Sequence, residues 1–221
     1  MAHNAKNRTS AQNRQTGPSQ KETENQAMNT IAVFCGSSEG ASPVYRERAQ
    51  ELGRELAGRG IALVYGGARV GLMGAVADAV LERGGRVIGV LPRFLQAREI
   101  AHEGLSELML VESMHERKAK MAELADGFIA LPGGPGTMDE FFEIFTWGQL
   151  GLHRKPCGLL NVGGYFDPIL SMFDMMERER FMQPRFRSMI ISDETPAGIL
   201  RKFADYEAPS VKTWNSGGRS A

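Results

Sequence analysis

The feature that most constrains the fold is an alternation of short apolar runs with longer amphipathic segments, repeated about seven times between residues 30 and 206. Runs such as TIAVFCG (30–36) and IALVYGG (61–67) have the length and β-branched content of buried strands. Strands that are apolar almost throughout are typical of a parallel sheet covered by helices on both faces. The sequence therefore predicts an α/β fold with a doubly wound sheet of about seven strands in three α/β/α layers.

The expected elements can be placed along the chain. Strands are expected at 30–36, 61–67, 86–92, 107–112, 127–134, 155–162 and 188–193. Helices are expected at 42–60, 71–85, 113–126, 137–150, 166–180 and 195–206, with an irregular stretch at 93–105. In such a Rossmann-like fold, ligands bind beyond the carboxyl ends of the strands, where the strand order reverses. We therefore expect functional residues in the strand-to-helix loops.

Composition divides the chain into one domain and two tails. Residues 1–28 are rich in Asn, Gln, Ser, Thr and Lys, and their apolar residues are almost all Ala. Burial cannot offset the ordering entropy of such a segment, so we expect a disordered N-terminal tail. It lacks the apolar stretch of roughly 7–15 residues that marks a signal peptide. Residues 29–208 are expected to form a single domain, followed by a flexible C-terminal tail at 209–221.

Charge and cysteine content exclude several classes of function. The 26 basic and 26 acidic residues balance and form no block of one sign, which argues against binding to nucleic acid or to an acidic membrane. No apolar run reaches the ~18 residues of a membrane helix. The two cysteines, Cys35 and Cys157, are too few for a disulfide framework or a four-cysteine zinc site. We expect reduced, buried thiols, a cytoplasmic protein and no bound metal.

Small residues follow the first expected strand in CGSSEGAS (35–42). Gly36, Ser37 and Ser38 offer free backbone N–H groups that suit a phosphate or the polar edge of a ring. An ordinary polar loop is an equally good interpretation of these three residues.

Glycines also mark the end of the second strand, in YGGARVGLMG (65–74). The spacing of Gly66, Gly67, Gly71 and Gly74 does not match G-x-G-x-x-G, and no acid ends the strand to bind a ribose. The nucleoside triphosphate loop is absent too. These glycines permit close approach of a ligand to the backbone, or tight packing of helix on strand.

Two cations stand near a helix start in VESMHERKAKM (111–121). Ser113 and Glu116 form a capping box, which places Arg117 and Lys118 in the first two turns. Cations there oppose the helix dipole at a cost of up to about 1 kcal/mol. Binding of an anion would explain that cost, and a solvated basic face is the alternative.

The segment LPGGPGTMDE (131–140) combines a glycine loop with a helix start. Gly133, Gly134 and Gly136 precede a helix N-terminus, where N–H groups and the dipole favour an anion. Thr137 and Glu140 match S/T-x-x-E, so Glu140 is also explained as the reciprocal cap of its helix.

A phosphate in this loop would lie close to the carboxylates of Asp139 and Glu140. That repulsion requires nearby cations. Arg117 and Lys118 meet the requirement if the fourth and fifth strands are neighbours in the sheet.

Two of these motifs together resemble the LONELY GUY (LOG) family of cytokinin riboside 5′-monophosphate phosphoribohydrolases, long mislabelled as lysine decarboxylases. The signatures are R-K-x-x-M, present at 117–121, and P-G-G-x-G-T-x-x-E, present at 132–140. The resemblance extends from about Ile31 to Tyr206. Pro135 and Asp139 are small departures, because other residues are common in the family at both positions.

The resemblance implies hydrolysis of the N-glycosidic bond of N6-modified adenosine 5′-monophosphates to a free base and ribose 5-phosphate, without a cofactor. Arg117 and Glu140 would be the catalytic pair. The implied substrate site comprises Gly36, Ser37, Ser38, Gly67, Met73, Gly74, Glu99, Arg117, Lys118, Gly133, Gly134, Pro135, Gly136, Thr137, Met138, Asp139, Glu140 and Thr146. A carboxylate such as Glu140 suits this chemistry, because cleavage passes through an oxocarbenium-like state.

Three alternatives stay open at this point. The chain could be a general AMP nucleosidase, or a carrier of a nucleotide or of the molybdenum cofactor, although a carrier should lack Arg117 or Glu140. A decarboxylase would need pyridoxal phosphate on a lysine, and Lys118, the one conceivable candidate, is better explained as an anion contact.

Helices 137–150 and 166–180 carry more Phe, Trp and Met than one core-facing stripe needs. The family is typically dimeric, so we expect a homodimer.

Overall fold

The computed structural model describes Met1 and residues 28–96 and 101–211. Most of the two expected tails, 1–28 and 209–221, lies outside these residues, and so does Glu99.

Seven strands form one parallel sheet, as expected from the sequence. They are β1 (Thr30–Phe34), β2 (Ala62–Tyr65), β3 (Val87–Pro92), β4 (Glu107–Val111), β5 (Gly127–Ala130), β6 (Cys157–Leu160) and β7 (Ile190–Asp193). Their order across the sheet is β4-β3-β2-β1-β5-β6-β7, and every adjacent pair is parallel. Most strands end a few residues before the end of the apolar run that predicted them, because the last residues of each run belong to the loop that follows the strand.

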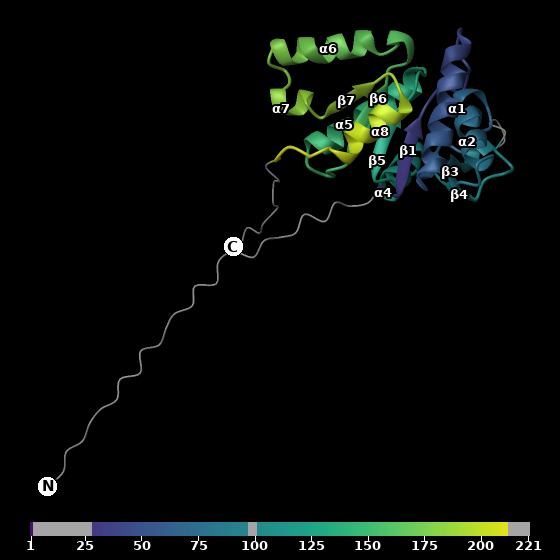
Figure 1. Cartoon of the computed structure of the whole chain (residues 1–221), viewed down its shortest axis with the longest axis horizontal. Helices are drawn as coiled ribbons and strands as arrows, with labels where there is room; N and C mark the ends of the chain where they lie inside the picture. Colours follow the sequence, from purple (N-terminus) through teal and green to yellow (C-terminus); the bar gives the residue numbers. More distant parts are fainter. Residues whose placement is uncertain (2–27, 97–100, 212–221) are drawn as a thin grey trace.

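Helices connect successive strands and cover both faces (Figure 1). They are α1 (Pro43–Gly58), α2 (Gly71–Leu81), α3 (Arg93–Gln96), α4 (Met114–Leu124), α5 (Pro135–Gln149), α6 (Asp167–Arg178), α7 (Pro184–Arg187) and α8 (Pro196–Ala204), with a 3₁₀ turn η1 (Val162–Gly164). The short α3 lies inside the stretch expected to be irregular, and α7 was not expected.

Alternate residues of the central strand build two separate cores. Ile31 and Val33 face the layer of α1, α2 and α8, whereas Ala32 and Phe34 face α4 and α5. All four are almost fully buried. This period of two, with both sets apolar, is why the strands read as continuous apolar runs.

The strand order reverses between β1 and β5. The chain proceeds from β1 outward to β4 and then returns to add β5, β6 and β7 on the other side. The loop after β1 leads to α1 on one face, and the loop after β5 leads to α5 on the other. Loops that diverge in this way open a crevice at the carboxyl edge of the sheet.

Large apolar side chains remain exposed around α6, which lies at the margin of the domain beside α7 (Figure 1). Met172 and Met175 of α6 are each 48% exposed, and Phe181 is 89% exposed. Among the described residues, no helix is both long enough and apolar enough to span a bilayer.

Candidate functional site

The loops after β1 and β5 are joined at the reversal point. Leu131 donates its backbone N–H to the carbonyl of Phe34 (2.9 Å), and Gly36 donates to the carbonyl of Pro132 (3.1 Å). A Cβ on Gly36 would lie 3.3 Å from the Cα of Gly133, so a side chain would crowd this junction. The two loops therefore form one continuous backbone platform.

The glycine loop after β5 presents the N-terminus of α5. Gly134 is the N-cap residue and has no side chain with which to cap the helix, so the first N–H groups of a 15-residue helix face this loop. A Cβ on Gly134 or Gly136 would meet nothing within 4 Å, whereas one on Gly133 would lie 2.2 Å from Oγ1 of Thr137. Open backbone N–H groups at a helix start are suited to an anion.

The capping role considered for Thr137 and Glu140 is wrong. The helix begins at Pro135, so Thr137 already lies in its first turn and Glu140 in its second. Both side chains are buried at the site rather than closing the helix end. The proline at the first position carries the helix start two residues earlier, since its fixed φ suits that place.

The capping box of α4 is confirmed with one difference. Oγ of Ser113 accepts from the N–H of Glu116 (3.1 Å), and the carboxylate of Glu116 accepts from the N–H of Glu112 (2.7 Å) rather than from that of Ser113. This cap starts the helix at Met114, which sets the turns in which Arg117 and Lys118 lie.

The condition that the fourth and fifth strands be neighbours is not met. β4 is the edge strand, and three strands separate it from β5. Arg117 and Lys118 reach α5 because α4 crosses back over the intervening strands on the same face. The helix that connects β4 to β5, rather than adjacency of these two strands, thus brings the two cations to the glycine loop.

Arg117 and Glu140 meet in the interior of the site. Nη2 of Arg117 lies 3.9 Å from Oε1 of Glu140, and the two side chains are only 9% and 11% exposed. Nε of Arg117 is buried without a hydrogen-bond partner among the described residues. At this separation the two groups attract each other but lie beyond hydrogen-bonding distance.

Gly66 makes room for that guanidinium. A Cβ at Gly66 would lie 1.9 Å from Nη2 of Arg117 and 3.2 Å from Sδ of Met73.

Cys35 directly follows β1 and lies close enough to Glu140 and Arg117 for both charges to affect its pKa. Burial and the Glu140 carboxylate raise the pKa of the Cys35 thiol, and Arg117 lowers it by less. The thiol is therefore protonated and inert, and both cysteines are free and buried, as expected.

Lys118 is held by two carboxylates of α5. Its Nζ lies 3.0 Å from Oδ2 of Asp139 and 2.9 Å from Oε2 of Glu143, and its side chain is 8% exposed. Burial alone would lower the pKa of Lys118, but the two carboxylates outweigh that effect and the pKa is raised. The lysine is thus a firmly charged link between α4 and α5.

The loops after β1 and β2 pack on each other. Ser37 and Ser38 are exposed, and Gly36 accepts a hydrogen bond from the N–H of Leu72 (3.1 Å) at the start of α2. Gly71 has φ +57° and lies against this loop, since its Cβ would be 2.3 Å from the carbonyl carbon of Ser37.

Two glycines named as site residues are explained by packing. Gly67 has φ +81°, and its carbonyl accepts from the N–H of His102 (3.0 Å). A Cβ on Gly74 would lie 2.2 Å from the carbonyl oxygen of Arg69, inside the first turn of α2. At both positions the space is taken by the protein's own backbone or core.

Some predicted site residues are not brought to the loop. Thr146 is exposed and donates its hydroxyl to the carbonyl of Phe142 (2.7 Å), about 13 Å along α5 from Thr137. Met138 is partly buried against the core beneath α5. Glu99 lies outside the described residues.

Tyr165 is a site residue that the sequence analysis missed. It follows η1, and its hydroxyl donates to the carbonyl of Gly133 (2.6 Å). Gly163 and Gly164 both have positive φ and turn the chain after β6 so that Tyr165 reaches the loop. The pair of glycines at a strand end was the available signal, since the other junctions carry the same mark.

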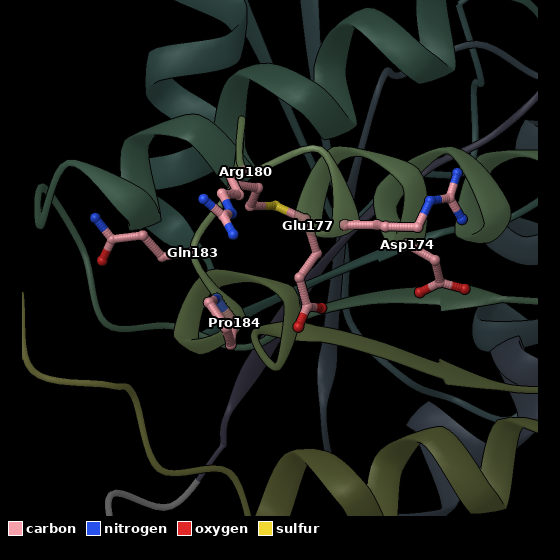
Figure 2. Close-up of a pocket in the computed structure, with 7 residues that line it drawn as sticks. Asp174, Glu177, Arg180, Gln183 and Pro184 are labelled. Carbon is pink, nitrogen blue, oxygen red and sulfur yellow. The ribbon is translucent and has the colours of Figure 1, made fainter.

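A cavity of about 520 Å³ lies elsewhere, between the end of α6 and α7 (Figure 2). Figure 2 shows Asp174, Glu177 and Arg180 along its rim. None of the residues expected to bind substrate lines it.

A lysine suited to pyridoxal phosphate is absent from the described part of the site. Lys118 is committed to two carboxylates. Lys155 precedes β6, at the opposite end of the sheet from the glycine loop, and its Nζ donates to the carbonyl of Ala122 (2.7 Å). Neither amine is placed to form a Schiff base beside Glu140, so the residues do not fit that cofactor.

Comparison with protein families and curated proteins gives a consistent result. Residues 73–203 match a family model described as possible lysine decarboxylase. The cytokinin riboside 5′-monophosphate phosphoribohydrolase LOG of Oryza sativa subsp. japonica is 51% identical over 176 residues, which are 80% of this chain and 73% of that protein. LOG7 of Arabidopsis thaliana, with the same enzyme name, is 51% identical over 177 residues, 80% of this chain and 82% of the relative.

Solved structures share the fold. A molybdenum cofactor binding protein from Rippkaea orientalis superposes with a TM-score of 0.61 at 21% identity, covering 80% of this chain and 95% of that one. DNA processing protein A from Helicobacter pylori gives a TM-score of 0.51 at 18% identity, covering 84% and 86%. At these identities the likeness concerns the fold alone.

Proposed function

Because this chain belongs to the LOG family of cytokinin riboside 5′-monophosphate phosphoribohydrolases, we propose that it hydrolyses the N-glycosidic bond of N6-modified adenosine 5′-monophosphates. The products are a free, cytokinin-type base and ribose 5-phosphate. The observation that carries the proposal is the buried approach of Arg117 to Glu140, 3.9 Å apart, beside an uncapped glycine loop.

The glycine loop is the place for the 5′-phosphate. The N-terminus of α5 offers backbone N–H groups and the positive end of its dipole, and Gly134 and Gly136 leave the approach open. Ser37 and Ser38 lie on the joined loop after β1 and can add hydroxyl contacts. Binding a group remote from the scissile bond positions the sugar for reaction.

Glu140 is placed to act on the ribose. Its carboxylate is one helical turn beyond Thr137 and is 11% exposed, so its charge is poorly screened by water. Cleavage builds positive charge on C1′ and the ring oxygen, which a fixed carboxylate stabilises. The same oxygen atoms can orient the attacking water.

Arg117 completes the pair. Its guanidinium attracts the Glu140 carboxylate from 3.9 Å, and the Nη atoms of a guanidinium carry further hydrogen-bond donors. Those donors suit the substrate phosphate or a ribose hydroxyl.

The test is release of base from a panel of 5′-monophosphates, measured by chromatography, with isopentenyl-AMP and AMP as its extremes. Glu140→Gln should lower kcat by about 10²–10⁴-fold while AMP still binds. Glu123→Gln removes a carboxylate that pairs with Lys120 on the surface of α4 and serves as the matched control. Absence of base release from every substrate, at high protein concentration, would sink the proposal, and preference for AMP would make the chain a general AMP nucleosidase.

We propose further that the protein is a cytoplasmic homodimer that joins through the α6 face. The exposed Met172, Met175 and Phe181 support an apolar contact, and two buried free thiols suit a reducing compartment. Light scattering on the wild type and on Met172→Glu/Met175→Glu tests the dimer, which should dissociate in the variant. A monomeric wild type would contradict the proposed dimer.

The proposed cytoplasmic location is tested with a fluorescent fusion protein. Fluorescence at a membrane or in the medium would contradict it.

A further inference from the structure

A second polar contact joins α4 to α5 one residue beyond the catalytic pair. Lys118 follows Arg117 on α4, and Asp139 precedes Glu140 on α5. Lys118 contacts Asp139 at 3.0 Å and Glu143, one turn further along α5, at 2.9 Å. The catalytic pair and this cluster of three residues are therefore successive links between the same two helices.

The cluster is poorly suited to hold the substrate phosphate. An ammonium group has three donors, and two carboxylates already face that of Lys118. One positive and two negative charges leave the cluster net negative, which repels an anion. The side chain is also 8% exposed, so it has little surface to offer a ligand.

The catalytic pair does not hold its own geometry. Arg117 and Glu140 are 3.9 Å apart, beyond hydrogen-bonding distance, and the guanidinium rests on the bare backbone of Gly66. Something else must set the separation of the two helices at this level. The adjacent residue, Lys118, makes polar contacts of 2.9 and 3.0 Å across the same interface, both within hydrogen-bonding distance.

We propose that Lys118 is a positioning residue, whose ion pairs with Asp139 and Glu143 hold α4 on α5 and thereby set the distance between Arg117 and Glu140. The inference rests on the proposed function and refines it, because it moves Lys118 from the substrate contacts to the supporting structure. A displacement of about 1 Å at a catalytic group can cost 10²-fold in rate.

The experiment compares four variants on the substrate that the wild type cleaves best. Lys118→Met removes the charge, Lys118→Arg keeps it, and Asp139→Asn/Glu143→Gln removes both partners while leaving the lysine. Lys120→Met is the matched control, because Lys120 lies on the same helix and pairs only with Glu123 of that helix among the described ion pairs. The readouts are kcat, KM and the inhibition constant of ribose 5-phosphate.

Positioning predicts that Lys118→Met lowers kcat by roughly 10–100-fold, with KM and the ribose 5-phosphate inhibition constant within about twofold of wild type. Lys118→Arg should recover most of kcat, the double variant should match Lys118→Met, and Lys120→Met should behave as wild type. A rise in KM and in the inhibition constant with unchanged kcat would instead make Lys118 a phosphate ligand and overturn the proposal. Equal losses in Lys118→Met and Lys120→Met, or no loss at all, would also overturn it.

A second test of the positioning role does not depend on the proposed function. In a crystal structure of Lys118→Met, the separation of Arg117 and Glu140 should increase by about 1 Å or more relative to wild type, whether or not any nucleotide is cleaved. An unchanged separation would overturn the positioning role even in an active enzyme. Should Lys118→Met not fold, the same measurement on the double variant decides the question.

Discussion

Two glycine-rich junctions of this protein look alike in sequence and differ in what fills them. The loop after β5 contains Gly134 and Gly136, where an added Cβ would meet nothing within 4 Å. The loop after β2 contains Gly66 and Gly71, where a Cβ would lie 1.9 Å from Arg117 and 2.3 Å from Ser37. Absent side chains leave space for a ligand in the first loop and for the protein itself in the second.

Glycines beside open space are therefore expected to serve ligand binding, and glycines packed against other residues to serve the folded structure; we call the two kinds open and filled. Substitutions at filled glycines should disturb stability or the placement of the proposed catalytic groups. Substitutions at open glycines should leave the fold intact and affect only the ligand.

The largest expected effect on stability is at Gly71. Gly71→Ala places a methyl group 2.3 Å from backbone atoms of the Gly36–Ser38 loop and requires an L-residue at φ +57°. Because neither obstacle can move cheaply, we expect a loss of about 3 kcal/mol in the free energy of unfolding, measured by urea titration. A loss within about 0.5 kcal/mol would show that this loop is not packed as described.

Gly66→Ala should affect catalysis more than stability. The obstacle is the end of a flexible side chain, Nη2 of Arg117, which can move away. We expect kcat to fall by about 10²-fold, since a catalytic group is displaced by an ångström or more. The free energy of unfolding should change by about 1 kcal/mol or less. Wild-type kcat in this variant would contradict the placement of the guanidinium.

Gly136→Ala should have a smaller effect, in which binding is weakened and the fold is not destabilised. The position is helical and open, so alanine should raise the free energy of unfolding by about 0.5 kcal/mol. The methyl group should stand where the phosphate binds and raise KM roughly tenfold, equivalent to about 1.4 kcal/mol. An unchanged KM would place the anion elsewhere, and a destabilised variant would mean that the loop is filled.

The smallest effect concerns the other end of α5, where Met189 and His153 fill the space beside Gly148. A Cβ on Gly148 would lie 2.9 Å from Cε of Met189 and 3.2 Å from the ring of His153. His153 donates from Nε2 to the carbonyl of Ile144 (2.8 Å) and accepts the N–H of Lys155 at Nδ1 (3.1 Å), which fixes the neutral tautomer. Burial lowers the pKa of His153, with a further contribution from the charge of Lys155, and the hydrogen bond to Ile144 opposes them.

Since the unfolded chain takes up this proton more readily, the contribution of His153 to stability is present above about pH 6.5 and is lost as the pH falls through the folded pKa. The measurement is the free energy of unfolding between pH 8 and 5, compared with His153→Gln. The variant should show a shallower decline. Parallel curves would contradict a lowered pKa of His153 in the folded protein.

Much of the architecture follows from local pattern. Apolar runs of strand length, separated by amphipathic segments, predicted all seven strands, because the inner strands β1, β2, β3, β5 and β6 are buried on both faces and the edge strands β4 and β7 are still largely apolar. The capping residue Ser113 predicted the start of α4 within one residue. The start of α5 was misjudged, because Pro135 begins the helix where S/T-x-x-E suggested Thr137.

By itself the sequence determined the fold class and, through two short motifs, singled out Arg117 and Glu140 as the proposed catalytic pair. Only the tertiary structure decided how they meet. The order of strands depends on contacts between segments far apart in the chain, so local pattern could not show that β4 is at the edge and that α4 carries Arg117 back. Nor could it show that Tyr165 reaches Gly133 from a third junction, or that Lys118 is already satisfied by Asp139 and Glu143. Residue types record which chemistry is available, whereas distances and occupied space decide which groups are left to perform it.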